Sequence, residues 1–202
     1  NSVTGGRLKM EFEYDSNDKI IKQLLFGSGV GSSWVLSGKT EYYFAGNQKL
    51  ILELHLDWNG SNWDSVSRFE YFYNTQEQLT QFVYQNYIAN KWENYLRYSY
   101  TYDGYENRVN SLTEEWLNRW QNLHLFTAYY SDGERMDSSL FQMWNSTDWE
   151  NYFRTTFYYN NQTQFLESFI GQLWTGVSWI NDLNRKITND QNGNQLLQLD
   201  LV

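Results

Sequence analysis

Tryptophan recurs along this chain at a nearly constant interval, and this repeat limits the possible folds more than any other feature. Six of the ten tryptophans follow one another at intervals of 28 to 30 residues: Trp34, Trp63, Trp92, Trp120, Trp149 and Trp179. The other four lie four or five positions before one of these, and Tyr87 takes that place in the third unit: Trp58, Trp116, Trp144 and Trp174. A fixed period of this length is typical of an array built from one supersecondary unit.

Within each unit the residues alternate as they do in a β-strand. After the second tryptophan, side chains of one parity are mostly aromatic, which predicts a strand of about ten residues. In the strand that starts at Trp149, this parity predicts one shared face for Trp149, Asn151, Phe153, Thr155, Phe157 and Tyr159. A turn rich in Asp, Asn, Gly and Gln follows the last aromatic residue, as in 74–78 and 190–194. A second strand then leads to the next pair of aromatic residues.

Two strands and two short turns account for the period, so one unit is predicted to be one β-hairpin. We expect an all-β array of about seven antiparallel hairpins, in a long meander or a spiralling sheet, that forms a single domain over 1–202. A parallel β-solenoid with one coil per unit is the alternative. The units are placed at about 6–37, 38–66, 67–95, 96–123, 124–152, 153–183 and 184–202.

The composition fits long strands and excludes several functions. The 202 residues include no proline, which would interrupt the hydrogen bonding of a central strand. The net charge of −9 argues against binding to nucleic acid or to an anionic membrane surface. No apolar run is long enough to insert in a membrane as a helix. The absence of cysteine excludes disulfides, zinc–thiolate sites and cysteine nucleophiles.

The repeat also has a recognisable signature, W-x3/4-W-x-N-x-x-R-x-x-Y-x-Y-[DN], which is found in 58–74, 87–103 and 144–160. It resembles repeats of secreted and surface proteins of Bacteroidetes, many of which carry a sorting domain for type IX secretion. The turn half, as in Tyr102-Asp103-Gly104, is similar to the YD repeats of Rhs-type proteins. The resemblance implies an extracellular or cell-surface location, and it brings no catalytic motif to this chain.

The sequence gives little support to a catalytic or metal-binding function. Asp64, Glu93 and Glu150 follow tryptophans and could suggest the paired acids of a glycosidase. Residues that recur at the period of the repeat are more simply explained as exposed side chains on one face of the sheet. His55 and His124 hold different positions in their units, so they form no repeated ligand set. We therefore predict no enzymatic activity, no catalytic residues, no metal and no cofactor.

The aromatic residues have two interpretations. Regularly spaced rings could stack on sugars and form a multivalent carbohydrate-binding or adhesin module. Alternatively, the paired rings could hold the hairpin ends together, which is favoured because nearly every unit keeps the pair. The residues concerned are Trp58, Trp63, Trp92, Trp116, Trp120, Trp144, Trp149, Trp174 and Trp179.

The two outer strands suggest a function in assembly. Both lack the proline that commonly protects a sheet edge. Their predicted edge residues are Leu8, Met10, Phe12 and Tyr14 in the first strand, and Leu197, Leu199 and Leu201 in the last. If the last strand of one copy pairs with the first strand of the next, the strand order continues and a filament or surface layer results. The chain could also be a fragment of a larger surface protein whose flanking repeats cover these edges.

Overall fold

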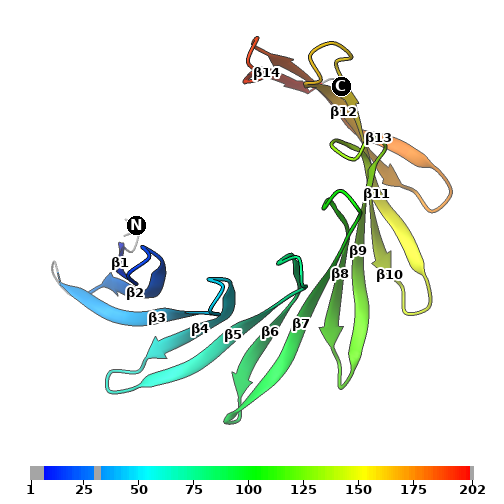
Figure 1. Ribbon diagram of the computed structural model, residues 1–202. Coiled ribbons are helices and arrows are strands. Elements are labelled where there is room, and N and C mark those ends of the chain that lie inside the picture. The colour runs from blue at the N-terminus through cyan, green and yellow to red at the C-terminus, as the bar shows by residue number, and fades with distance from the viewer. Residues whose placement is uncertain (1–6, 30–32, 201–202) are drawn as a thin grey trace, which may run out of the picture. The chain divides into compact units, whose positions relative to one another are not determined.

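The computed structural model describes residues 7–29 and 33–200, and every regular element in these ranges is a β-strand. Fourteen strands form one open sheet in chain order, and neighbouring strands run antiparallel (Figure 1). This confirms the predicted meander of hairpins, and the alternative of a parallel solenoid is wrong. Among the described residues, no helix is long and apolar enough to cross a lipid bilayer.

The chain divides into two compact units, with the boundary between Arg97 and Tyr98. The strands of the first unit are β1 (Leu8–Tyr14), β2 (Ile20–Ser28), β3 (Trp34–Phe44), β4 (Leu50–Trp58), β5 (Trp63–Tyr73) and β6 (Leu79–Ile88). The boundary falls within β7 (Lys91–Tyr102). The second unit continues with β8 (Arg108–Trp116), β9 (Trp120–Tyr130), β10 (Met136–Trp144), β11 (Trp149–Tyr159), β12 (Leu166–Trp174), β13 (Trp179–Asn189) and β14 (Gln195–Asp200).

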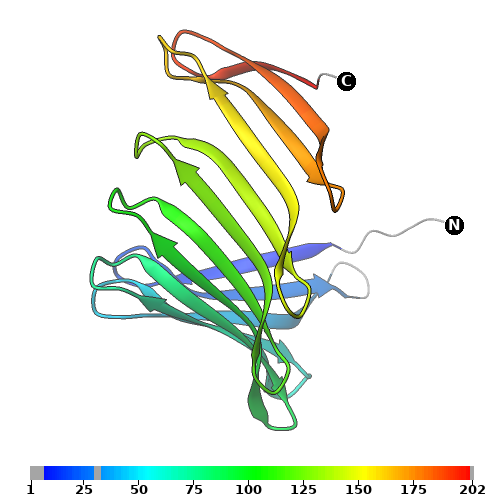
Figure 2. The same cartoon turned by 90° about the vertical axis from the view of Figure 1, so that its right-hand side faces the viewer.

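The turns rich in Asp and Asn close one end of each hairpin (Figure 2). In the first, the Asp15 amide donates to the Lys19 carbonyl at 2.8 Å, and the Asp15 carboxylate accepts from the amides of Asn17 and Lys19. Asp18 adopts a φ of 60°, the left-handed conformation that a three-residue hairpin loop needs at its last position. Asn74 makes the same bonds in its own turn, which explains why both Asp and Asn are found at this site.

The turns between tryptophans close the other end. In 59–62, the Asn59 amide donates to the Asn62 carbonyl, and the Asn59 side-chain oxygen accepts from the amides of Ser61 and Asn62. Gly60 has a φ of 98°, which side chains other than glycine rarely adopt. Trp58 and Trp63 are direct partners across this turn.

A β-bulge shortly after Trp149 corrects the prediction of one shared face. Leu140 of β10 pairs with Arg154 of β11, and Gln142 of β10 pairs with Asn151 of β11. These two pairs are two residues apart on β10 but three residues apart on β11, so β11 contains one extra residue. Leu140 and Gln142 share one face of β10, and therefore Arg154 and Asn151 share it too. Phe153, Phe157 and Tyr159 lie on the opposite face. The predicted grouping of Trp149 and Asn151 with Phe153, Thr155, Phe157 and Tyr159 is thus wrong.

Few apolar side chains are buried, because the sheet has two faces and no second layer appears in the described units. Val83 and Ala128 are the buried apolar residues of the described chain, and no large side chain there is fully buried. Most strand positions are half-exposed. Stability must therefore come mainly from contacts between neighbouring strands, such as the stacking of Phe69 on Tyr84 with ring centroids 4.7 Å apart.

Candidate functional site

The paired rings lie against each other at the hairpin ends, as the stapling interpretation predicts. Their centroids are 4.9 to 5.1 Å apart, and their planes are inclined by 57 to 70°. The pairs are Trp58–Trp63, Tyr87–Trp92, Trp116–Trp120, Trp144–Trp149 and Trp174–Trp179. Tilted and edge-to-face contacts are the favourable geometries for aromatic pairs. Trp34 differs, because its strand partner is Ser28 and 42% of its surface is exposed.

Cationic side chains cover several of these rings from the neighbouring unit. We call them the cation column, and it consists of the Lys and Arg residues that stand five positions after the second tryptophan of a unit. Lys39 lies 4.7 Å from the Trp63 ring centroid, Arg68 lies 4.7 Å from Trp92, and Arg154 lies 4.5 Å from Trp179. Cation–π contacts of this kind occupy the ring face that a sugar would need. The arrangement therefore favours a structural role for these tryptophans.

A hydrogen-bonded chain of side chains accompanies the cation column, and the sequence predictions missed it. Arg154 Nε donates to Gln172 Oε1 at 2.7 Å, and Gln172 Nε2 donates to Asn181 Oδ1 at 2.8 Å. The same chain joins Arg68 to Gln85 and Gln85 to Asn94. The signal was available, since glutamine recurs two positions before the first aromatic residue of a pair and asparagine two positions after the second.

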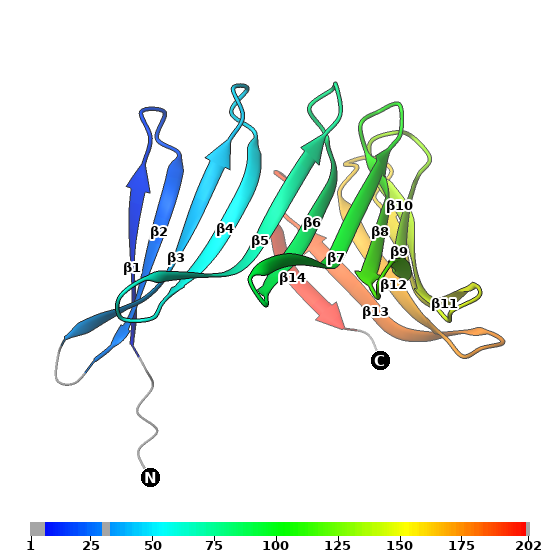
Figure 3. The same cartoon turned by 90° about the horizontal axis from the view of Figure 1, so that it is seen from below.

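The predicted edge residues are exposed where the structure describes them. Leu8 is 70% exposed and Leu199 is 47% exposed, and Met10, Phe12, Tyr14 and Leu197 also belong to the exposed apolar residues. Leu201 lies outside the described residues. Figure 3 shows β1 at the outer side of the first unit, with β2 as its neighbour.

The two apolar edges face opposite sides of the sheet. Leu199 pairs with Lys186, so the two side chains lie on the same face of the sheet. Lys186 holds the same position in its repeat unit as Glu41 in β3 and Glu11 in β1. Glu41 and Glu11 form ion pairs at 2.5 Å with Lys39 and Lys9, members of the same charged face. Leu197 and Leu199 therefore share the face of the cation column. The even-numbered residues of β1 lie on the other face.

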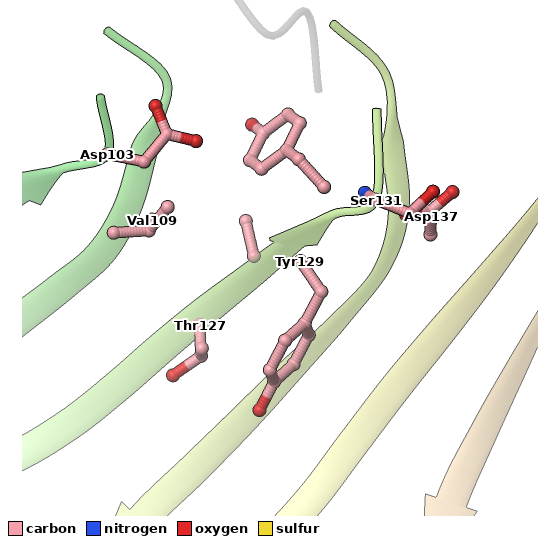
Figure 4. Close-up of a pocket in the computed structure, with 8 residues that line it drawn as sticks. Asp103, Val109, Thr127, Tyr129, Ser131 and Asp137 are labelled. Atoms are coloured by element: carbon pink, nitrogen blue, oxygen red, sulfur yellow. The ribbon is translucent and has the colours of Figure 1, made fainter. Parts of the chain in front are cut away.

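The second unit contains a pocket of about 460 Å³ that the sequence did not predict (Figure 4). Asp103, Thr127, Tyr129 and Asp137 line it, together with Val109, Ala128, Tyr130 and Ser131. The Asp103 carboxylate accepts from the amides of Tyr105 and Asn107 at 2.9 Å, and the Ser131 amide donates to Asp137. Tyr129 is 49% exposed. The pocket combines phenol rings with carboxylates, which suits a polar ligand with hydroxyl groups.

The two histidines are packed against rings. The His55 ring lies 5.6 Å from Phe69 and the His124 ring 5.2 Å from Phe141, measured between centroids. His55 Nε2 is 2.9 Å from Glu53 Oε1, but the alignment is not that of a directed hydrogen bond. In the part of the chain that the structure describes, no three His, Asp or Glu side chains are placed to hold a metal ion.

Comparison with known proteins extends only to the fold. No family model matches the sequence, and no curated protein is similar to it. A protein of unknown function from Bacteroides fragilis shares 12% identity and a TM-score of 0.53, over 65% of this chain and 97% of that one. At this identity the likeness concerns the fold alone.

Two further structures are weaker matches. A DUF3836 family protein from Bacteroides vulgatus has 22% identity and a TM-score of 0.34, covering 42% of this chain and 90% of that one. A porin-like protein from Bacteroides uniformis has 10% identity and a TM-score of 0.36, covering 98% of this chain and 90% of that one. The structural neighbours thus include proteins of Bacteroidetes, while no specific repeat family is identified.

Proposed function

We propose that this chain is a non-enzymatic, extracellular structural protein that associates with other copies through the outer strands of its sheet. The observation that carries the proposal is the pair of uncovered edges. Within residues 7–29 and 33–200, β1 and β14 each have one neighbouring strand, and their apolar side chains are exposed. An edge of this kind offers a row of unpaired backbone donors and acceptors to another strand.

Head-to-tail pairing of β14 with β1 is the arrangement expected from the strand order. The repeat predicts the register of this contact, because β14 and β1 are the repeat equivalents of β12 and β13. In the β12–β13 pair, Ser168 lies opposite Lys186 and Ile170 lies opposite Asn184. The equivalent positions would place Leu197 opposite Glu11, and Leu199 opposite Lys9. Such a contact gains its free energy mostly from backbone hydrogen bonds, and if it continues from copy to copy it yields a filament.

Electron microscopy tests the proposal most simply. The purified chain is imaged by negative stain across a concentration series in dilute buffer, and oligomers or filaments should become more frequent as the concentration rises. Dispersed monomers at every concentration would contradict self-association through the edges.

A carbohydrate-binding or adhesin function is the second candidate, and the pocket beside Tyr129 favours it. Its phenol rings and carboxylates resemble the polar and aromatic groups that hold sugars. The paired tryptophans are less suited to this task, since their faces are partly occupied by cations and by each other.

A glycan array followed by fluorescence titration tests this second candidate. Tyr129→Ala should weaken any sugar binding by at least about tenfold, as expected for the loss of a stacking ring. Tyr158→Ala is the matched control, because Tyr158 is similarly exposed and holds the same position in the next unit. Equal effects of the two substitutions, or binding that neither changes, would remove the pocket from consideration.

A further inference from the structure

The outer backbone groups of β1 belong to its even-numbered residues. The Asp15 amide donates to Lys19 across the turn, so the backbone of Asp15 is directed toward β2. In an antiparallel strand this direction alternates from residue to residue. Leu8, Met10 and Phe12 therefore direct their N–H and C=O groups away from β2, where the described chain provides no strand to receive them.

The side chains of this segment form a pattern that is complementary to its own reverse. In chain order the residues are Arg7, Leu8, Lys9, Met10, Glu11, Phe12 and Glu13. Cations precede Met10 and carboxylates follow it, at matching distances. The intervening residues are apolar and exposed. When such a strand is turned around Met10, each cation meets a carboxylate, and each apolar residue meets an apolar residue.

We propose that β1 pairs antiparallel with β1 of a second copy, about a two-fold axis through Met10. Lys9 of each copy then lies opposite Glu11 of the other, Arg7 lies opposite Glu13, and Leu8 lies opposite Phe12. This inference rests on the proposed self-association and names the edge and the partner. An isologous contact of this kind is self-complementary, unlike the head-to-tail contact.

The register follows from two constraints. The outward backbone groups can bond only when even-numbered residues meet even-numbered residues. Moving the axis to Lys9 would place Lys9 opposite Lys9, and moving it to Glu11 would place Glu11 opposite Glu11. Like charges directly opposite destabilise a strand pair. Among these neighbouring registers, only the axis at Met10 pairs opposite charges throughout.

Head-to-tail pairing lacks this complementarity, since Leu197 and Leu199 would meet Glu11 and Lys9. The two-fold pairing instead brings the apolar residues of β1 together on one face and its charges together on the other. The existing ion pairs of Lys9 with Glu11 and of Lys22 with Glu13 leave these side chains substantially exposed, so they remain accessible to a second copy.

A charge exchange tests the pairing directly. In a dimer of the Lys9→Glu variant, the carboxylate at position 9 of each copy would lie opposite the carboxylate of Glu11 of the other. In a dimer of the Glu11→Lys variant, two cations would meet at the same places. Each variant alone should dimerise about tenfold or more weakly than the parent in sedimentation velocity. An equimolar mixture should regain dimers, because one chain then supplies only carboxylates at positions 9 and 11 and the other only cations. Circular dichroism of each variant verifies that it is folded.

The same measurement separates this inference from the proposed function. Leu199→Lys is the control, because it would place a cation opposite Lys9 in head-to-tail pairing and leaves the two-fold contact unchanged. If the parent associates, and only Leu199→Lys weakens it, the two-fold pairing is overturned while self-association stands. If the parent stays monomeric at all concentrations, both proposals fail.

A single cysteine gives an independent test that does not depend on charge. The chain has no cysteine of its own. Met10→Cys should form a disulfide dimer under mild oxidation, because the two Cα atoms at the axis would be about 5.5 Å apart. Leu8→Cys is the matched control, since the two Cα atoms of that residue would be roughly 14 Å apart. Equal cross-linking of both variants, or none of Met10→Cys, would contradict the register.

Discussion

The carboxylates of the hairpin turns make individual residues sensitive to pH. The backbone amide of Lys19, and then that of Asn17, lowers the pKa of Asp15 below its usual value. The side-chain amide of Asn194, followed by its backbone amide, lowers the pKa of Asp190. Each carboxylate stabilises its turn when it is ionised. This stabilisation is complete above the unfolded pKa of 3.8 and is lost as the pH falls through the lower, folded pKa.

Asparagine at these two sites should reduce the loss of stability in acid. Asn74 shows that an uncharged side chain makes the same turn bonds. We therefore expect the melting temperature of the Asp15→Asn, Asp190→Asn double variant to fall less than that of the parent between about pH 6 and pH 3. Thermal unfolding monitored by circular dichroism provides the comparison. Parallel curves for the two proteins would show that these turns do not contribute to acid sensitivity.

At the scale of the hairpin, the aromatic pair joins the two strands next to the tryptophan turn. Trp149 lies 5.1 Å from Trp144, whereas Trp34 has Ser28 as its strand partner. Trp149→Ala should therefore cost about 1–3 kcal/mol of unfolding free energy, through the lost ring pair and the lost apolar area.

Trp34→Ala is the matched control for this prediction. It removes an exposed ring from the equivalent repeat position, and surface substitutions usually change stability by less than about 0.5 kcal/mol. Urea titrations of both variants give the two free energies. Similar losses would mean that the ring pair adds nothing beyond the side chain itself.

The hairpins could be predicted from the sequence because the residues that mark their two ends are close together in the chain. Asp15 and Asn74 stand where a side-chain acceptor closes a turn, and Trp58 and Trp63 mark the other end. The face of each residue could not be predicted, since aromatic residues occupy both parities and the bulge near Asn151 appears only once the strand register is known. The Arg154–Gln172–Asn181 chain was hidden for the same reason, because its members are neighbours only across paired strands.

At the scale of the whole molecule, an array of hairpins in one sheet leaves the outer strands as its natural points of association. Each hairpin contacts mainly the strands before and after it, as in other repeat proteins. No described large side chain is fully buried, so additional strand pairing remains a way to gain stability. The self-complementary charges of β1 then determine which edge of a second copy fits best.

Hydrogen exchange measured across a concentration series tests the role of the β1 edge most directly. In dilute solution the amides of Leu8, Met10 and Phe12 should exchange rapidly, while those of Lys9, Glu11 and Glu13 are protected by β2. At high concentration the first group should become protected, and the second group should change little. If the exchange of Met10 is the same at every concentration at which the protein associates, β1 is not the strand through which copies pair.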